Sequence, residues 1–152
     1  NCVFIGVCGW WDYNQKDSEV MKKNENYFKE WIPSLSKEQN LEFANNVIER
    51  SEKEYLNLKN RIEYYEKDEK IDNIIIVTHT VPIKKFCDDE KVDTEMNMKY
   101  NELIKSSNKL SKWIFGHTHH NFYEKIDNIE YICNPRGRPA DFNRIKYNSF
   151  SF

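Results

Sequence analysis

Three of the four histidines of the chain fall within the segment WIFGHTHHNF, which runs from Trp113 to Phe122. They are His117, His119 and His120, and the fourth, His79, ends the upstream segment NIIIVTH. Neutral imidazole is the commonest protein ligand of transition-metal ions. His117 and His119 point to one side if their segment is extended, but on a tight turn they diverge and can serve two adjacent ions. His79, His117 and His119 are therefore the candidate metal ligands, and His120 is expected to support them or to be exposed.

The residues before these histidines indicate where the imidazoles lie. Both groups follow short apolar runs, at 73–79 and 112–117, with the composition of buried β-strands. In α/β sheets, functional groups gather outside the carboxyl ends of parallel strands. If the two strands are parallel neighbours, His79 and His117 reach the same rim of the sheet. Gly116 would let the backbone come close to whatever lies there.

The rest of the chain supplies the elements that must position this rim. The strongest helical period has Leu41, Ala44, Ile48, Tyr55, Leu58, Ile62 and Tyr65 on one face, with Ser36 as N-cap and Gln39 completing a capping box. Further expected elements are a buried strand at 2–8, a polar loop at 84–98, a short helix at 101–110, and a hairpin of strands 121–126 and 129–133. This order predicts one layered α/β domain over residues 1–152.

Composition excludes several classes of protein. The 152 residues carry a formal net charge of −2, which leaves no electrostatic footprint for nucleic acid or an anionic membrane. No apolar run approaches the ~20 residues that span a bilayer. The cysteines (Cys2, Cys8, Cys87 and Cys133) form no CxxC pair, and those beside strands are expected to be small buried hydrophobes. A reducing, cytoplasmic location is therefore expected.

Several motifs together resemble the calcineurin-like metallophosphoesterase superfamily. VTHTVP and FGHTHH resemble its last two motifs, a strand-terminal His and a Gly-His-x-His. ICNPRGRP (132–139) is similar to the strand and turn that follow Gly-His-x-His in many members, and FIGVCGWWDYN resembles a strand that runs into a Trp-Ser/Thr-Asp-like loop. The resemblance implies the C-terminal part of a layered β-sandwich flanked by helices.

It also implies a hydrolase with a dinuclear metal site. By position, His79 and His117 would bind one divalent ion and His119 the other, the ions being Mn, Fe, Zn or Ni. The metals would activate a hydroxide that attacks a phosphomonoester or phosphodiester substrate. Arg136 and Arg138 follow the last core strand, and their guanidinium groups suit phosphate, so they are the candidate substrate-binding residues.

The motifs that would complete such a site are absent from the chain. The superfamily places an Asp-x-His, a Gly-Asp and a Gly-Asn-His-Asp/Glu motif before the strand equivalent to 2–8. These segments supply the bridging carboxylate and the histidine that protonates the leaving group, so no general acid or base is named here. We therefore expect this chain to act with an N-terminal segment of the same domain.

Two alternatives remain at this stage. The chain can be a non-catalytic metallophosphoesterase-like scaffold that binds a protein partner. It can also be a coiled-coil interaction module built on residues 41–65, with the histidines incidental.

Overall fold

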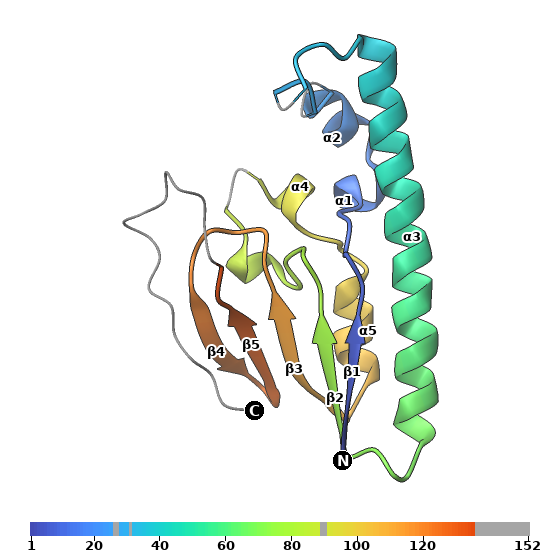
Figure 1. Ribbon diagram of the computed structural model, residues 1–152, viewed down its shortest axis with the longest axis vertical. Helices are drawn as coiled ribbons and strands as arrows, with labels where there is room; N and C mark the ends of the chain where they lie inside the picture. Colours follow the sequence, from blue (N-terminus) through green and yellow to red (C-terminus); the bar gives the residue numbers. More distant parts are fainter. Residues whose placement is uncertain (26–27, 31, 89–90, 136–152) are drawn as a thin grey trace.

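The computed structural model describes residues 1–25, 28–30, 32–88 and 91–135. These residues form an α/β fold around one five-stranded mixed sheet with the order β1-β2-β3-β5-β4 (Figure 1). The strands are β1 (Cys2–Gly6), β2 (Asn73–Val77), β3 (Leu110–Phe115), β4 (Phe122–Ile126) and β5 (Ile129–Cys133). The helices are α1 (Tyr13–Lys16), α2 (Ser18–Lys23), η1 (Phe28–Glu30), α3 (Lys37–Lys67), η2 (Lys84–Phe86), α4 (Val92–Glu95) and α5 (Tyr100–Ser106).

Four of the five strands run parallel. β1 pairs with β2, β2 with β3, and β3 with β5, and β4 adds to β5 as the antiparallel edge strand. The hairpin was predicted correctly, with Ile126 opposite Ile129 and Asp127 at a φ of 52° in the turn. The carboxyl ends of β2 and β3 therefore share one rim, which faces α1 and α4 in Figure 1.

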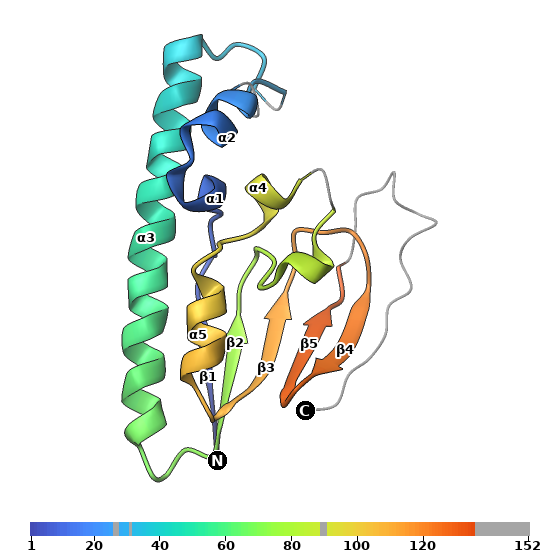
Figure 2. The same ribbon diagram turned by 180° about the vertical axis from the view of Figure 1, so that it is seen from behind.

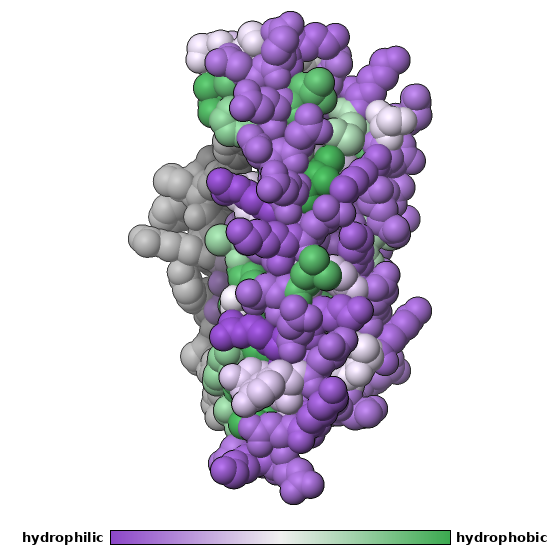
Figure 3. Space-filling view, turned by 90° about the vertical axis from the view of Figure 1, so that its right-hand side faces the viewer, coloured by the Kyte–Doolittle hydropathy of each residue, from purple (hydrophilic) through white to green (hydrophobic). Residues whose placement is uncertain are grey.

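Helix α3 begins where the capping residues predict. The Ser36 hydroxyl accepts from the backbone N–H of Gln39, and the Gln39 side chain accepts from the backbone N–H of Ser36. The predicted stripe is wrong at its first member, because Leu41 is 54% exposed, whereas Asn40 and Val47 are buried. Figure 3 shows that the outward face of α3 is mostly hydrophilic, with separate apolar spots. No helix within the described ranges combines the length and apolarity needed to cross a bilayer.

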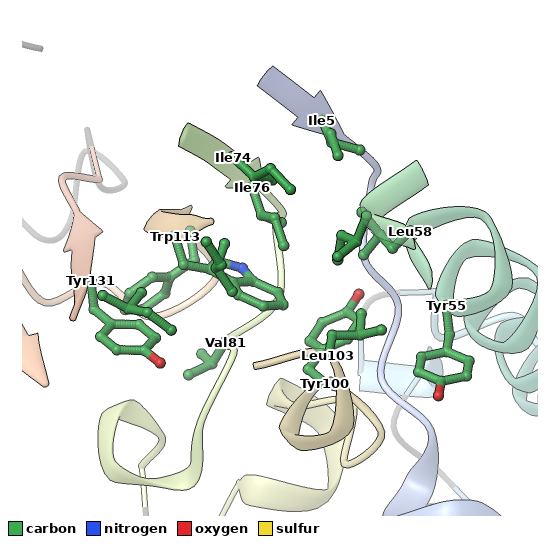
Figure 4. Close-up of a cluster of buried hydrophobic side chains, with 14 of the residues drawn as sticks. Ile5, Tyr55, Leu58, Ile74, Ile76, Val81, Tyr100, Leu103, Trp113 and Tyr131 are labelled. Atoms are coloured by element: carbon green, nitrogen blue, oxygen red, sulfur yellow. The ribbon is translucent and has the colours of Figure 1, made fainter. Parts of the chain in front are cut away.

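The core lies between the sheet and the helices α3 and α5, which Figure 2 shows from the side of α5. Leu58 and Ile62 of α3 pack with Ile5, Ile74 and Ile76 of the first two strands (Figure 4). This contact uses the helix stripe that a coiled coil would need as its seam. Burial of such side chains contributes about 1.5–3 kcal/mol each.

Two large aromatic residues fill the centre of this core. Trp113 and Tyr100 are fully buried with ring centroids 5.1 Å apart. The indole N–H of Trp113 donates to the Thr78 hydroxyl at 2.9 Å, and that hydroxyl donates to the Thr80 carbonyl. The strand end that leads into His79 is therefore fixed to β3 by a buried side-chain hydrogen bond.

The segment 84–98 is not the polar loop that its composition predicted. It contains η2 and α4, and Phe86, Glu95 and Met96 are at most 3% exposed. Glu95 accepts two hydrogen bonds. Its carboxylate accepts from the backbone N–H of Asp88, and its backbone carbonyl accepts from the N–H of Val81. A few apolar contacts and hydrogen bonds thus fold a sequence rich in charge against the sheet.

Strand β1 also differs from the prediction of a fully buried strand. Ile5 is completely buried, but Phe4 on the opposite face is 53% exposed. β1 is the terminal strand of the sheet, so its outer edge has no strand partner among the described residues. The expectation that the cysteines beside strands are buried is wrong for Cys2 of β1 and for Cys8, which are both exposed. Cys87 is partly exposed, and only Cys133, on β5, is buried.

Candidate functional site

The ends of β2 and β3 bring His79 and His117 into contact. The Nε2 atom of His79 lies 3.1 Å from Nδ1 of His117, and the ring centroids are 5.0 Å apart at 75°. One ring nitrogen donates a hydrogen bond and the other accepts it, with the roles set by the tautomers. Two of the three predicted ligands therefore meet at one rim.

The backbone at His117 is strained. His117 has a φ of 66°, and Thr118 N–H donates to the Gly116 carbonyl at 2.8 Å, two residues back. This combination is a γ-turn of the rare positive-φ type, with His117 at its apex. Of the two arrangements considered for His117 and His119, the structure has the tight turn rather than the extended segment. A left-handed non-glycine residue costs about 1–3 kcal/mol and often marks a functional site.

The backbone of His79 is held from both sides. Its N–H donates to the Cys8 carbonyl at 2.7 Å, and its carbonyl accepts from Gly116 N–H at 3.0 Å. A Cβ at Gly116 would lie 3.4 Å from Nδ1 of His79, in ordinary van der Waals contact. The group that lies close to Gly116 is thus His79 itself.

His79 is biased toward its neutral form. The pKa of His79 is lowered, first because its surroundings desolvate the ring and second because of the charge of nearby His119. Since metal ions bind the neutral imidazole, this direction favours a ligand role. His119 is therefore near enough to His79 to act on it electrostatically.

The separation of the two nitrogens suits a shared ion. Two nitrogens that each lie about 2.0–2.1 Å from one Zn²⁺ are roughly 2.8–3.4 Å apart, depending on the coordination geometry. The observed 3.1 Å falls in this range. Within the described residues, however, no three His, Cys, Asp or Glu side chains gather closely enough to hold an ion. The pair therefore fits part of a coordination shell, and further donors must complete it.

The other candidate residues are placed as follows. His120 is exposed, with its Nε2 3.8 Å from the carboxylate of Asp88, outside the His79–His117 pair. Arg136 and Arg138, the candidate phosphate-binding residues, lie outside the described residues. Asp12 is 2% exposed and accepts from Met98 N–H at 3.1 Å, so it fixes a loop and does not line the site.

An aromatic cleft of about 410 Å³ opens beside the histidine pair. Its lining is almost entirely apolar and consists of Cys8, Gly9, Trp10, Trp11, Phe28, His79 and His117. The Trp11 ring lies 5.8 Å from that of His117 and 6.1 Å from that of Phe28. The imidazole pair thus forms part of the lining of a hydrophobic cavity.

The loop that builds this cleft is fixed at several points. Gly9 N–H donates to the Glu54 carboxylate at 2.7 Å, and the Asn97 side chain donates to the Trp10 carbonyl at 3.3 Å. Gly9 has a φ of 71°, and a Cβ there would lie 2.8 Å from the Thr80 hydroxyl oxygen. Glycine is therefore required at this turn.

Sequence reasoning missed some residues of the site. Phe28 lies in a mixed segment with no periodic signal, so nothing in the sequence assigns it to the cleft. Glu54 looks like one more charge on a long helix, yet it binds the Gly9 backbone. Both depend on contacts between residues distant in sequence.

Comparison of the chain with known proteins identifies no similar protein. No family model, no curated protein and no solved structure matches the chain.

Proposed function

We propose that this chain supplies histidine ligands to a two-metal centre that hydrolyses a phosphate ester. The observation that carries the proposal is the 3.1 Å approach of His79 and His117 from the ends of two parallel strands. The resemblance of VTHTVP and FGHTHH to metallophosphoesterase motifs points to the same chemistry. The substrate is a phosphomonoester or phosphodiester.

The residues of the chain have distinct roles in this proposal. His79 and His117 hold one divalent ion, and His119 on the following turn holds the second. When bound, such ions supply a hydroxide nucleophile and neutralise charge on the phosphate. The strained turn at His117 and the two backbone bonds of His79 keep the imidazoles oriented. Arg136 and Arg138 contact the phosphate.

The sheet supports a layered arrangement with an N-terminal segment. Opposite α5, one row across the sheet consists of Gly6, Val77, Ile114, Ile132 and Tyr123. Tyr123 is 62% exposed, Val77 and Ile114 are partly exposed and Ile132 is 3% exposed, and among the described elements no helix lies over this face (Figure 1). In the proposal this face is the inner face of one layer of a β-sandwich. The opposing layer comes from the N-terminal segment, with the carboxylates and the general acid.

The decisive experiment measures metal content and hydrolysis together in the full-length protein. His79→Ala and His117→Ala are expected to lose bound metal and to lower kcat/KM for p-nitrophenyl phosphate or its bis ester by at least about 100-fold. His120→Ala is the matched control and should retain both properties. Circular dichroism checks that each variant is folded. Unchanged metal content and activity in the folded His79→Ala and His117→Ala variants would contradict the proposal.

A non-catalytic scaffold that binds a protein partner is the second candidate. It is favoured by the lack of a third metal-ligating side chain beside the pair within the described residues. This function predicts a folded full-length protein without stoichiometric metal and without hydrolysis of either ester. Such a result would replace the catalytic proposal by the scaffold.

A further inference from the structure

The cleft beside the histidine pair differs from an ordinary phosphate site. Its lining contains no Lys, Arg, Asp or Glu side chain among the described residues. Transfer of an unpaired charge into such surroundings is unfavourable, whereas an apolar group gains from leaving water. The cavity therefore suits an uncharged group joined to the phosphate rather than the phosphate itself.

The aromatic rings that line the cleft indicate what kind of uncharged group fits it. Trp10 and Phe28 are both partly exposed and line the cleft, while Trp11 is 5% exposed and forms its wall. Trp11 and Phe28 are close to parallel, at 23°. Flat aromatic ligands pack on such rings by stacking or by edge contacts.

The loop that carries Trp10 is held by residues outside the cleft. Glu54 and Asn97 hold the backbone of Gly9 and Trp10, and the Arg50 guanidinium lies 5.8 Å from the centre of the Trp10 ring. Residues that are fixed in advance lose little freedom when a ligand binds. Trp10 is therefore positioned by the protein and does not have to be ordered by the ligand.

We propose that this cleft binds a flat, uncharged aromatic ring, so that the preferred substrate is a phosphate ester of an aromatic alcohol. The assignment of the ester rests on the proposed function, whereas the binding of the ring does not. The ring occupies the space beside Trp10 and Phe28, and the ester oxygen points toward His79 and His117.

Ring binding is tested first, without any reaction. The full-length protein is titrated with 2-naphthol and, separately, with decahydro-2-naphthol, its saturated and non-planar analogue, by isothermal titration calorimetry. The expected result is binding of 2-naphthol on the order of 10-fold tighter than binding of the analogue. Equal affinities, or no binding of 2-naphthol, would overturn the proposal.

Variants then locate the ring. Trp10→Ala and Phe28→Ala should each weaken 2-naphthol binding by on the order of 10-fold, and Trp10→Phe should restore most of it. Phe43→Ala is the matched control, because Phe43 touches Phe28 at 5.4 Å between ring centroids but does not line the cleft. Phe43→Ala should bind 2-naphthol like the wild type. If Trp10→Ala and Phe28→Ala also bind like the wild type, the ring does not bind in this cleft.

Hydrolysis separates this proposal from the proposed function. With 2-naphthyl phosphate and decahydro-2-naphthyl phosphate as substrates, the aromatic ester should have the lower KM, and Trp10→Ala should remove the difference. Binding of 2-naphthol with no hydrolysis of these two monoesters, of p-nitrophenyl phosphate or of its bis ester contradicts the proposed function alone and supports the ring site. Hydrolysis of both esters with equal KM supports the proposed function and overturns the ring site.

Discussion

Nε2 of His79 and Nδ1 of His117 lie 3.1 Å apart although the two residues are 38 positions apart in sequence. The parallel pairing of β2 with β3 brings their chain segments together, and the γ-turn at His117 directs the second ring toward the first. This contact is the geometric basis for the proposed metal site and for the first two predictions.

Zn²⁺ is expected to stabilise the full-length protein through this pair. At about 100 times its Kd, a ligand that binds only the folded state raises the free energy of unfolding by ~2.7 kcal/mol. Thermal unfolding with and without Zn²⁺ should show this gain in the wild type and in His120→Ala. His79→Ala and His117→Ala should lose it, and a gain that persists in both would show that Zn²⁺ binds elsewhere.

The strained turn at His117 predicts that glycine is more stable there than alanine. His117→Gly and His117→Ala both remove the imidazole, so their difference isolates the cost of a φ of 66°. Glycine adopts this conformation freely, and we expect His117→Gly to be more stable by roughly 1 kcal/mol. Urea denaturation measures the difference. Equal stability would mean that the turn relaxes once the imidazole is gone.

Gly9 should tolerate no side chain. Gly9→Ala combines a φ of 71° with a Cβ only 2.8 Å from the Thr80 hydroxyl oxygen, so a loss of at least about 2 kcal/mol in unfolding free energy is expected. Gly6→Ala is the control, because its Cβ would meet only the Val77 carbonyl at 3.9 Å, and it should change stability by less than about 0.5 kcal/mol. Similar effects of the two substitutions would contradict the prediction.

The Thr78 hydroxyl should contribute to stability rather than to chemistry. Thr78→Val leaves the buried indole N–H of Trp113 and the Thr80 carbonyl without their side-chain partner, at a cost of about 1–3 kcal/mol. Thr78→Ser keeps the hydroxyl and should cost clearly less. Chemical denaturation measures the free energy of unfolding of both variants and of the wild type. A Thr78→Val variant as stable as the wild type would contradict the stabilising role of this hydrogen bond.

Glu95 predicts a pH-dependent stability. Burial raises the pKa of Glu95, with the charge of Asp88 as a weaker contribution in the same direction. Since the folded state then holds the proton more tightly than the unfolded chain, stability falls as the pH rises from the ordinary Glu pKa through the raised one. Gln carries no charge and can still accept from Asp88 N–H, so Glu95→Gln should gain stability over the wild type as the pH rises.

The measurement is urea denaturation of both proteins between about pH 4 and pH 8. Glu49→Gln, on the exposed face of α3, is the control and should follow the pH dependence of the wild type. A stability difference between Glu95→Gln and the wild type that does not change with pH would show that the carboxyl is not destabilised by burial.

The sequence predicts the parts of this fold that depend on local patterns. The capping box at Ser36 and the hairpin turn at Asp127 follow from periodicity and turn residues. The apolar runs predict two strands, and their parallel pairing is the condition for a shared rim that the structure meets. Burial within 84–98 and the exposure of Phe4 could not be predicted, because both depend on which distant residues pack against these segments.

The candidate site also has features that the sequence predicts and features that it does not. The meeting of His79 with His117 follows from two strand ends, so the sequence contains its signal. The positive φ of His117 and the place of Phe28 in the cleft arise from tertiary contacts and left no such signal. Metal ligation by His79, His117 and His119 stays a prediction, as does the cytoplasmic location.

The outer edge of β1, which has no strand partner within the described ranges, has a consequence for solutions of this protein. An open strand is a template for edge-to-edge aggregation between copies. The groove beside Gly6 at this edge is lined by Arg50, Lys53 and Arg61 of α3 together with Glu54, so two copies that pair there bring mainly like charges together. We expect these cations to oppose self-association, and salt should weaken their repulsion because the Debye length falls to about 3 Å at 1 M.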